Sequence, residues 1–182
     1  MLRLPPISLV TPATVQEAAE ALSKENARLV AGGTDLWPNM KRRHQKAENV
    51  ISLMSIAGLD AIDANGADIK IGGTATLSNI IRDETVRSRF PAFAKAVASI
   101  SSPPLRNMGT IGGNLCVDTR CNYYNQTEEW RRSIDYCLKE EGTMCWVATK
   151  SPRCWAHTAS DSAPILCALE AQVKLVSAKC ER

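Results

Sequence analysis

Hydrophobic and polar positions alternate in two different ways along the chain, and the first pattern is that of alternating helix and strand. Apolar side chains over 15–22 keep the spacing of one helix face, and Thr14 with a glutamate three residues later fits a capping box. Short apolar runs at 28–31 and 49–53 are typical of buried strands. Strands that alternate with helical segments usually pair in parallel. Residues 1–58 are therefore predicted to form a small α/β lobe.

The second pattern, over residues 59–182, begins with a hairpin. Two short apolar segments flank Asn65-Gly66, a dipeptide that favours a tight turn between antiparallel strands. Helical patterns follow over 77–81 and 91–100, and the second begins with a proline, which suits the first turn of a helix. This mixture predicts an α+β fold of two lobes, in which the second lobe contains a mixed or antiparallel sheet.

Regular patterning then weakens. Residues 110–116 predict a glycine-containing turn, and residues 117–158 show no convincing period, which predicts a mostly irregular insertion. A short helix over 163–169 and a strand over 172–177 follow. The strand is typical of the first arm of a hairpin, so we expect its partner strand or a further domain beyond the given sequence.

Composition narrows the class of protein. Of 182 residues, 45% are hydrophobic and 23% charged, which is typical of a globular chain. The net charge of +3 is too small for a nucleic-acid-binding or polybasic membrane-binding protein. No apolar run approaches the roughly 20 residues that cross a bilayer. We therefore expect a soluble cytoplasmic protein that binds neither nucleic acid nor membrane.

Cysteines change the picture. There are seven of them, and an odd number in a non-secreted chain points to metal, cluster or catalytic thiols rather than to disulfides. The candidate metal ligands gather in the irregular insertion: Cys121, Cys137, Cys145 and Cys154. Four thiolates suit either an iron–sulfur cluster or tetrahedral zinc. The close cysteine pairs of common zinc motifs are absent, which weakens the case for zinc without excluding it.

Two glycine turns are candidate phosphate-binding segments. The first spans residues 31–36 and the second residues 110–114, and each places a threonine beside a Gly-Gly pair. Without Cβ atoms, the backbone can approach a diphosphate closely and direct its N–H groups inward. Most single Gly-Gly turns are only tight corners, but two of them favour a nucleotide held between lobes. Neither turn is a Walker loop or a G-x-G-x-x-G motif.

Taken together, the two turns resemble the paired FAD motifs of the flavin subunits of molybdenum hydroxylases, the group of xanthine dehydrogenase, CO dehydrogenase and 4-hydroxybenzoyl-CoA reductase. The likeness continues at 71–77 and 160–164 and covers essentially the whole chain in the same order. It implies a two-lobed FAD-binding domain in which Asp161 lies near the ribityl chain or the flavin. It also implies that the diphosphate and ribityl chain are held by Ala31, Gly32, Gly33, Thr34, Asp35, Leu36, Thr110, Ile111, Gly112, Gly113 and Asn114. Members of the family continue with a C-terminal domain that the given sequence does not include.

Within that family, the insertion from Cys116 onward resembles the 4-hydroxybenzoyl-CoA reductase branch, whose flavin subunit contains an additional 4Fe-4S cluster. The resemblance implies that Cys121, Cys137, Cys145 and Cys154 are the cluster ligands. Flavin subunits of ordinary xanthine and CO dehydrogenases lack the insertion.

The function implied is electron transfer. FAD and a 4Fe-4S cluster would exchange electrons with an external carrier such as ferredoxin and with partner subunits, namely a small 2Fe-2S subunit and a large molybdenum-cofactor subunit. The chain would then be an oxidoreductase subunit without catalytic residues of its own, since the cofactors do the redox chemistry. Two alternatives remain: a xanthine or CO dehydrogenase-type FAD subunit whose insertion holds zinc or nothing, and a non-enzymatic interaction domain stapled by zinc.

Other residues favour structural roles. Cys116 is interpreted as a small buried filler, Cys167 as a core residue and Cys180 as an unligated thiol near the chain end. His44 and His157 are too few for a histidine metal site. The charged residues of the insertion are expected to be exposed: Glu128, Glu129, Glu140, Glu141, Arg131, Arg132, Lys139 and Lys150.

Overall fold

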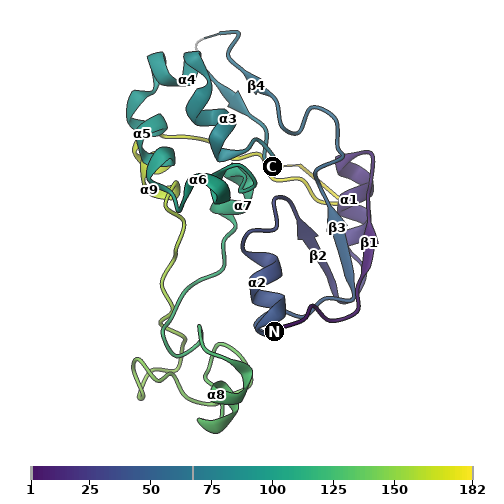
Figure 1. Ribbon diagram of the computed structural model, residues 1–182, viewed down its shortest axis with the longest axis vertical. Coiled ribbons are helices and arrows are strands. Elements are labelled where there is room, and N and C mark those ends of the chain that lie inside the picture. Colours follow the sequence, from purple (N-terminus) through teal and green to yellow (C-terminus); the bar gives the residue numbers. More distant parts are fainter. Residues whose placement is uncertain (1, 67, 182) are drawn as a thin grey trace.

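The computed structural model describes residues 2–66 and 68–181, and its first part is a small parallel sheet with two helices (Figure 1). The strand order is β1-β3-β2, so the central strand β3 has a hydrogen-bonded neighbour on each side. Both pairings are parallel, as predicted. Val50 and Ile51 of the central strand are fully buried. The elements are β1 (Ser8–Val10), α1 (Val15–Leu22), β2 (Ala27–Val30), α2 (Leu36–Lys41) and β3 (Asn49–Ser52).

Helix α1 begins as its sequence predicts, with one difference. The Thr14 hydroxyl accepts a hydrogen bond from the Glu17 amide at 3.1 Å. The Glu17 carboxylate accepts from the Ala13 amide at 2.9 Å, one residue before the position that a capping box requires. Ala18 then packs with Ile51 in the core, which fixes the helix on the sheet.

The second part is built from a hairpin and a group of short helices. Its two strands pair antiparallel, so the predicted hairpin is confirmed, although residues 64–69 separate the paired positions Asp63 and Lys70 where a tight turn is predicted. Ile80, Val86 and Val97 form the centre of its core and are fully buried. The elements are β4 (Ile62–Asp63), β5 (Lys70–Ile71), α3 (Leu77–Arg82), α4 (Glu84–Arg89), α5 (Pro91–Ser99), α6 (Pro103–Arg106), α7 (Ile111–Leu115) and α9 (Ala163–Ala168).

Two predicted elements are wrong. The predicted turn at 110–116 contains helix α7, because Thr110 caps it and the Ile111 amide donates to the Ala75 carbonyl at 3.0 Å. These contacts offset the low helix propensity of its two glycines. The predicted strand at 172–177 is not formed among the described residues, where only an isolated bridge joins Val176 to Glu181. This segment lies against no other strand of the described chain, so its backbone has no ladder to join.

Residues 117–158, called the cysteine segment below, form a separate irregular lobe. Figure 1 shows this segment beneath α7 and α9 and beside α2. Its one helix, α8 (Glu128–Ser133), is capped by the Thr127 hydroxyl, and the rest has little regular structure among the described residues, as predicted. The division of the chain into lobes at 1–58 and 59–182 stays a prediction.

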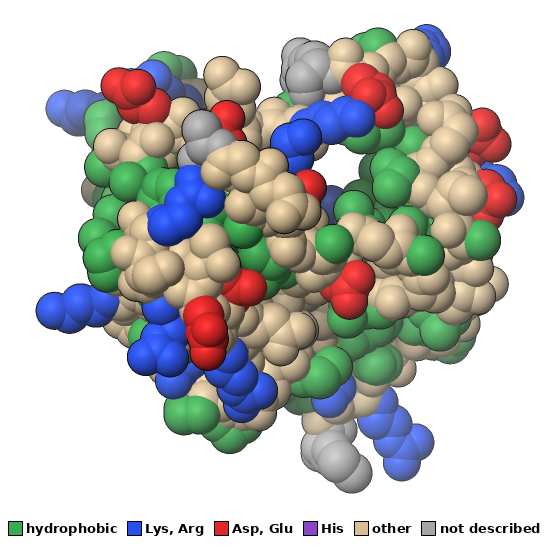
Figure 2. All heavy atoms as spheres, turned by 90° about the horizontal axis from the view of Figure 1, so that it is seen from above, with side chains coloured by type: hydrophobic (Ala, Val, Ile, Leu, Met, Phe, Trp, Pro, Cys, Tyr) green, Lys and Arg blue, Asp and Glu red, His purple; other side chains and the backbone are tan. Residues whose placement is uncertain are grey.

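Charges within the cysteine segment are less exposed than predicted. The side chain of Arg131 is only 1% exposed and forms ion pairs with Glu128 and Glu140. The expectation of exposed charge is therefore wrong for these three residues, because the loops fold around the guanidinium. It is also wrong for Lys139, whose side chain is 15% exposed and pairs with Asp118 at 2.8 Å. From above, Figure 2 shows basic and acidic side chains interspersed on the outer face and a hollow between two masses of the molecule. None of the helices in the described ranges has the length and apolarity that crossing a bilayer requires.

Candidate functional site

The fold brings the first predicted glycine turn against the residues just before the second, and packs the second against the backbone at Gly73. A Cβ atom on Gly32 would lie 1.6 Å from the carbonyl oxygen of Met108, just before the second turn. The Gly112 amide donates to the Gly73 carbonyl at 2.9 Å, and a Cβ on Gly112 would lie 2.6 Å from that oxygen. The backbone segments therefore approach more closely than any side chain at these positions would allow.

The first turn has a backbone conformation that needs glycine. Gly33 has a φ of +72°, and a Cβ there would lie 2.1 Å from the indole nitrogen of Trp37. Trp37 packs against the core around Val30 and Met40, so the indole cannot move away freely. The turn leads directly into α2, and this places its amides at the start of a helix.

The two turns differ in how their amides are used. Within the described residues, no acceptor is found for the amides of Gly33, Thr34 and Asp35 in the first turn. In the second turn, the Gly113 amide donates to the Thr110 hydroxyl at 3.1 Å, and the preceding two amides bond to the neighbouring 73–75 backbone. The first turn thus offers free N–H groups, whereas the second is fixed by its own contacts.

Asn114 links the second turn to the Asp161 loop. Its side-chain oxygen accepts from the Ser162 amide at 3.0 Å, from the Ser162 hydroxyl at 2.6 Å and from the Ser160 hydroxyl at 3.2 Å. Ser160 and Ser162 are buried, while Asp161 between them is exposed. The loop that contains Asp161 therefore lies beside the second turn, and the place of Asp161 near the ribityl chain or the flavin stays a prediction.

Asp35, at the end of the first turn, is directed toward the cysteine segment. Its carboxylate forms an ion pair with Arg120 and accepts from the Asn39 amide group at 2.9 Å. Leu36 begins α2 and packs in the core of the first part. Sequence reasoning missed Arg120 and Asn39, because Arg120 lies 85 positions from Asp35 and no local pattern connects them.

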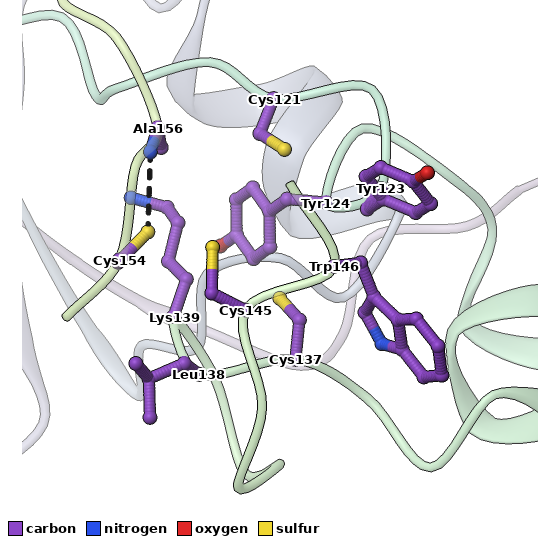
Figure 3. Close-up of a pocket in the computed structure, with 10 residues that line it drawn as sticks. All are labelled: Cys121, Tyr123, Tyr124, Cys137, Leu138, Lys139, Cys145, Trp146, Cys154 and Ala156. Atoms are coloured by element: carbon purple, nitrogen blue, oxygen red, sulfur yellow. Dashed lines mark hydrogen bonds between the residues drawn. The ribbon is translucent and has the colours of Figure 1, made fainter. Parts of the chain in front are cut away.

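All four predicted cysteine ligands line one pocket. They reach it from separate stretches of the cysteine segment, and Figure 3 shows their sulfur atoms around a common space beside the ring of Tyr124. Cys137 and Cys145 are buried, Cys121 is half-buried and Cys154 is exposed. The cavity between them is about 10 Å³. Among the described residues, no three His, Cys, Asp or Glu side chains converge tightly enough to hold one metal ion.

Backbone amides are directed at the sulfur atoms in this pocket. The Ala156 amide donates to the Cys154 sulfur at 3.3 Å. A hydrogen bond from the Ala148 amide lowers the pKa of the Cys145 thiol, whereas burial raises the pKa of Cys137. Amide donors of this kind stabilise thiolates, which are the form of cysteine that binds metal.

The remaining cysteines lie outside the pocket. Cys116 and Cys167 are both exposed, so the predictions of a buried filler and of a core residue are wrong. Cys116 follows α7 where the chain leaves the second part, and the short helix α9 leaves Cys167 on its outer side. Cys180 is exposed as well.

An aromatic pair joins the pocket to the segment after α2. The rings of His44 and Tyr124 stack with centroids 4.7 Å apart, and the Tyr124 hydroxyl donates to the His44 carbonyl at 2.8 Å. Lys139 lies 4.9 Å above the same ring. Burial raises the pKa of Tyr124 to about 12 and lowers that of His44. His44 therefore has a structural role, as the sequence suggested.

Comparison with known proteins identifies the class. Residues 5–182 match the family described as FAD binding domain in molybdopterin dehydrogenase. The chain belongs to this family.

Three curated relatives illustrate the range of the family. The carbon monoxide dehydrogenase medium chain of Hydrogenophaga pseudoflava is 36% identical over 106 residues, which cover 57% of this chain and 37% of that protein. The xanthine dehydrogenase FAD-binding subunit of Escherichia coli O157:H7 is 31% identical over 106 residues, 57% of this chain and 36% of that protein. The aldehyde oxidoreductase FAD-binding subunit PaoB of Escherichia coli K12 is 31% identical over 173 residues, 92% of this chain and 54% of that protein. This chain thus spans about two-fifths to one-half of the length of these relatives.

Solved structures agree on the fold. Carbon monoxide dehydrogenase from Hydrogenophaga pseudoflava superimposes with a TM-score of 0.60 and 34% identity, over 62% of this chain and 40% of that one. Quinoline 2-oxidoreductase from Pseudomonas putida 86 gives a TM-score of 0.60 and 29% identity over 62% of this chain and 40% of that one. The PaoB alignment covers 92% of this chain, so it must include at least part of the cysteine segment.

Proposed function

We propose that this chain is the FAD-binding portion of an electron-transfer subunit in a molybdenum-containing oxidoreductase of the CO or xanthine dehydrogenase type. The names of the relatives favour this enzyme type over a 4-hydroxybenzoyl-CoA reductase. The alternative considered from the sequence has the same enzyme type but an insertion that holds zinc or nothing, so the cluster proposed below is a separate proposal. By analogy with the family, the partners are a large molybdenum-cofactor subunit and a small 2Fe-2S subunit. The organic substrate would then be converted outside this chain.

The single observation that carries the FAD assignment is the set of free amides in the first glycine turn. Amides of Gly33, Thr34 and Asp35 lack acceptors among the described residues, and they precede a helix, where N–H groups favour an anion. The Thr34 hydroxyl adds a donor beside them. The backbone at Met108, just before the second turn, limits the movement of the first turn, because Gly32 touches it. When bound, FAD supplies the capacity to accept one or two electrons.

We further propose that the pocket in the cysteine segment holds a 4Fe-4S cluster through Cys121, Cys137, Cys145 and Cys154. The supporting observation is that the four thiols surround a space instead of a point. Tetrahedral zinc would require every sulfur at about 2.3 Å from one ion. A cluster, by contrast, is held by thiolates spread around it. The cavity of about 10 Å³ must widen for this, which the irregular loops on which these cysteines lie allow.

The two cofactors together give the chain a role as a relay. Iron–sulfur clusters exchange single electrons, so a cluster beside FAD adapts a one-electron carrier such as ferredoxin to the two-electron chemistry of the molybdenum subunit. The chain's own residues bind and orient the two groups and limit the access of water. Aromatic side chains beside the thiols, Tyr123, Tyr124 and Trp146, would do this at the cluster.

Purification without oxygen, followed by a visible spectrum and analysis of flavin, iron, sulfide and zinc, tests both proposals. We expect flavin bands together with a broad iron–thiolate absorption and iron and sulfide in equal amounts. Flavin with zinc, or flavin with an empty pocket, would retain the FAD assignment and remove the cluster. A colourless zinc protein would remove both and support an interaction domain.

A further inference from the structure

We infer that Arg120 is a positioning residue shared by the two sites, so that filling the thiol pocket strengthens FAD binding at the first glycine turn. The inference rests on the proposed function, because it needs both FAD and an iron–sulfur cluster as ligands. It adds a thermodynamic link between them and a named residue that transmits it.

Arg120 is the point at which the cysteine segment is closed. Its amide donates to the His157 carbonyl at 2.8 Å, and the His157 amide donates to the Arg120 carbonyl at 3.0 Å. Cys121 directly follows Arg120, and Cys154 lies three residues before His157. A ligand that holds both cysteines therefore also fixes this neck.

The Arg120 side chain extends from the neck into the first glycine turn. Its guanidinium forms an ion pair with the Asp35 carboxylate and lies 3.5 Å from the Asn39 side-chain oxygen. Asn39 in turn donates to the other Asp35 oxygen at 2.9 Å. Both carboxylate oxygens are thus held by the neck and by α2, which fixes the conformation of the residue whose amide closes the phosphate-binding turn.

A second contact, made by His44, also joins the cysteine segment to the first glycine turn. Beyond the stacked ring pair, the His44 ring nitrogen Nε2 lies 2.8 Å from the Gln126 carbonyl oxygen. The other ring nitrogen lies 3.5 Å from the same Asn39 oxygen that Arg120 contacts. Tyr124, the stacking partner, lines the thiol pocket. The pocket and the turn are therefore joined through two routes that meet at Asn39.

This geometry couples the binding of a cluster in the thiol pocket to the binding of FAD at the first glycine turn. The cysteine segment consists of irregular loops, which a cluster would cross-link at four points. The ordering of the neck that FAD binding requires is then already present, so less free energy is lost when FAD binds. By reciprocity, FAD must strengthen cluster retention by the same factor.

The test measures the dissociation constant of FAD by fluorescence quenching for the full chain, once loaded with iron and sulfide and once stripped by a chelator under reducing conditions. We expect FAD to bind at least roughly 5-fold more tightly to the loaded form, a typical coupling between sites. The substitution Arg120→Gln should remove this difference while the iron content and the circular dichroism spectrum stay unchanged. Arg132→Gln is the matched control, because that side chain is 70% exposed and its ion pair is with Glu128 on its own helix.

The possible outcomes distinguish failure of this inference from failure of the proposed function. A difference that persists in Arg120→Gln, or equal affinities for the loaded and stripped wild type, overturns the inference and leaves the proposed function intact. Failure of the wild type to bind FAD or iron at all overturns the proposed function instead. If Arg120→Gln does not fold, Asp35→Asn removes the same ion pair with nearly the same side-chain shape and must also abolish the difference.

Discussion

The glycine turns and the thiol pocket solve the problem of holding a cofactor in opposite ways. The turns are made of backbone, and their close approach to neighbouring backbone depends on the absence of a Cβ atom at Gly32 and Gly112. The pocket is made of side chains on loops that have little regular structure, and the ion pairs around Arg131 lie elsewhere in the same segment. A site made of backbone is therefore rigid before its ligand arrives, whereas a site made of loops is completed by its ligand.

The largest effect should come from breaking the rigid site. The substitution Gly32→Val places a branched side chain where even a Cβ would be 1.6 Å from the Met108 carbonyl oxygen. We expect destabilisation of about 3 kcal/mol or more, with loss of FAD, measured by urea unfolding and flavin content. Gly73→Ala is the control, because a Cβ there meets nothing within 4 Å. Equal damage from both changes would contradict the close approach of the two turns.

The next effect should separate the two sites. Cys137→Ser removes a buried thiol from the pocket, so we expect loss of iron with flavin retained at a weaker affinity. Cys116→Ser is the matched change at an exposed cysteine outside the pocket, and it should leave both contents unchanged. Iron and flavin analysis of the two variants decides the matter, and iron loss in the Cys116 variant would show that the ligand set is wrong.

A smaller pair of changes compares one helix cap in each region. Thr110→Ala removes the buried hydroxyl that accepts from the Gly113 amide, and Thr127→Ala removes the corresponding contact to the Trp130 amide at 3.3 Å. Each should cost about 1 kcal/mol. Thermal unfolding measures the cost, and ligand contents should fall in opposite patterns: flavin for Thr110→Ala and iron for Thr127→Ala. Identical patterns would mean that the two regions do not act as separate sites.

The smallest effect is a pH dependence at the contact between the regions. Burial, followed by the positive charges of Arg131 and Arg42, holds the pKa of His44 below its usual 6.5, although the Gln126 carbonyl and Glu140 oppose the shift. The folded state therefore binds this proton less readily than the unfolded chain does. Stability from this source is complete above pH 6.5 and is lost as the pH falls below it, by at most about 1.4 kcal/mol per pH unit. Unfolding of His44→Gln should show a shallower slope in this range, and an unchanged slope would assign the effect elsewhere.

The same contrast explains what the sequence could and could not predict. The first Gly-Gly pair, the Thr14 cap and the Asn65-Gly66 hairpin are local signals, and the structure contains the elements they indicate, whereas the second Gly-Gly pair lies in helix α7. The four pocket cysteines were also found, because thiols clustered in one irregular stretch are conspicuous. Contacts such as Arg120 with Asp35 connect distant positions, and no spacing rule reveals them.

The wrong predictions also concern contacts between distant parts of the chain. Burial was expected of Cys116 because it directly follows the second glycine turn, and of Cys167 because its sequence neighbours are apolar, but exposure is decided by how short helices pack. Arg131 was expected to be solvated, yet Glu128, which precedes it, and Glu140, which follows it, both form ion pairs with its buried side chain. The predicted strand at 172–177 has the right alternation, but a strand forms only where a second one lies alongside.

The closed neck at Arg120 and His157 has a consequence for protein engineering. Because the chain enters and leaves the thiol-bearing lobe side by side, as antiparallel neighbours, the lobe can be excised at this neck if the surface left at His44 and Arg42 is made polar. A two-residue hairpin turn is the common way to join such neighbours, and it would let the flavin scaffold be studied, or fitted with a different electron relay, without redesign of its core.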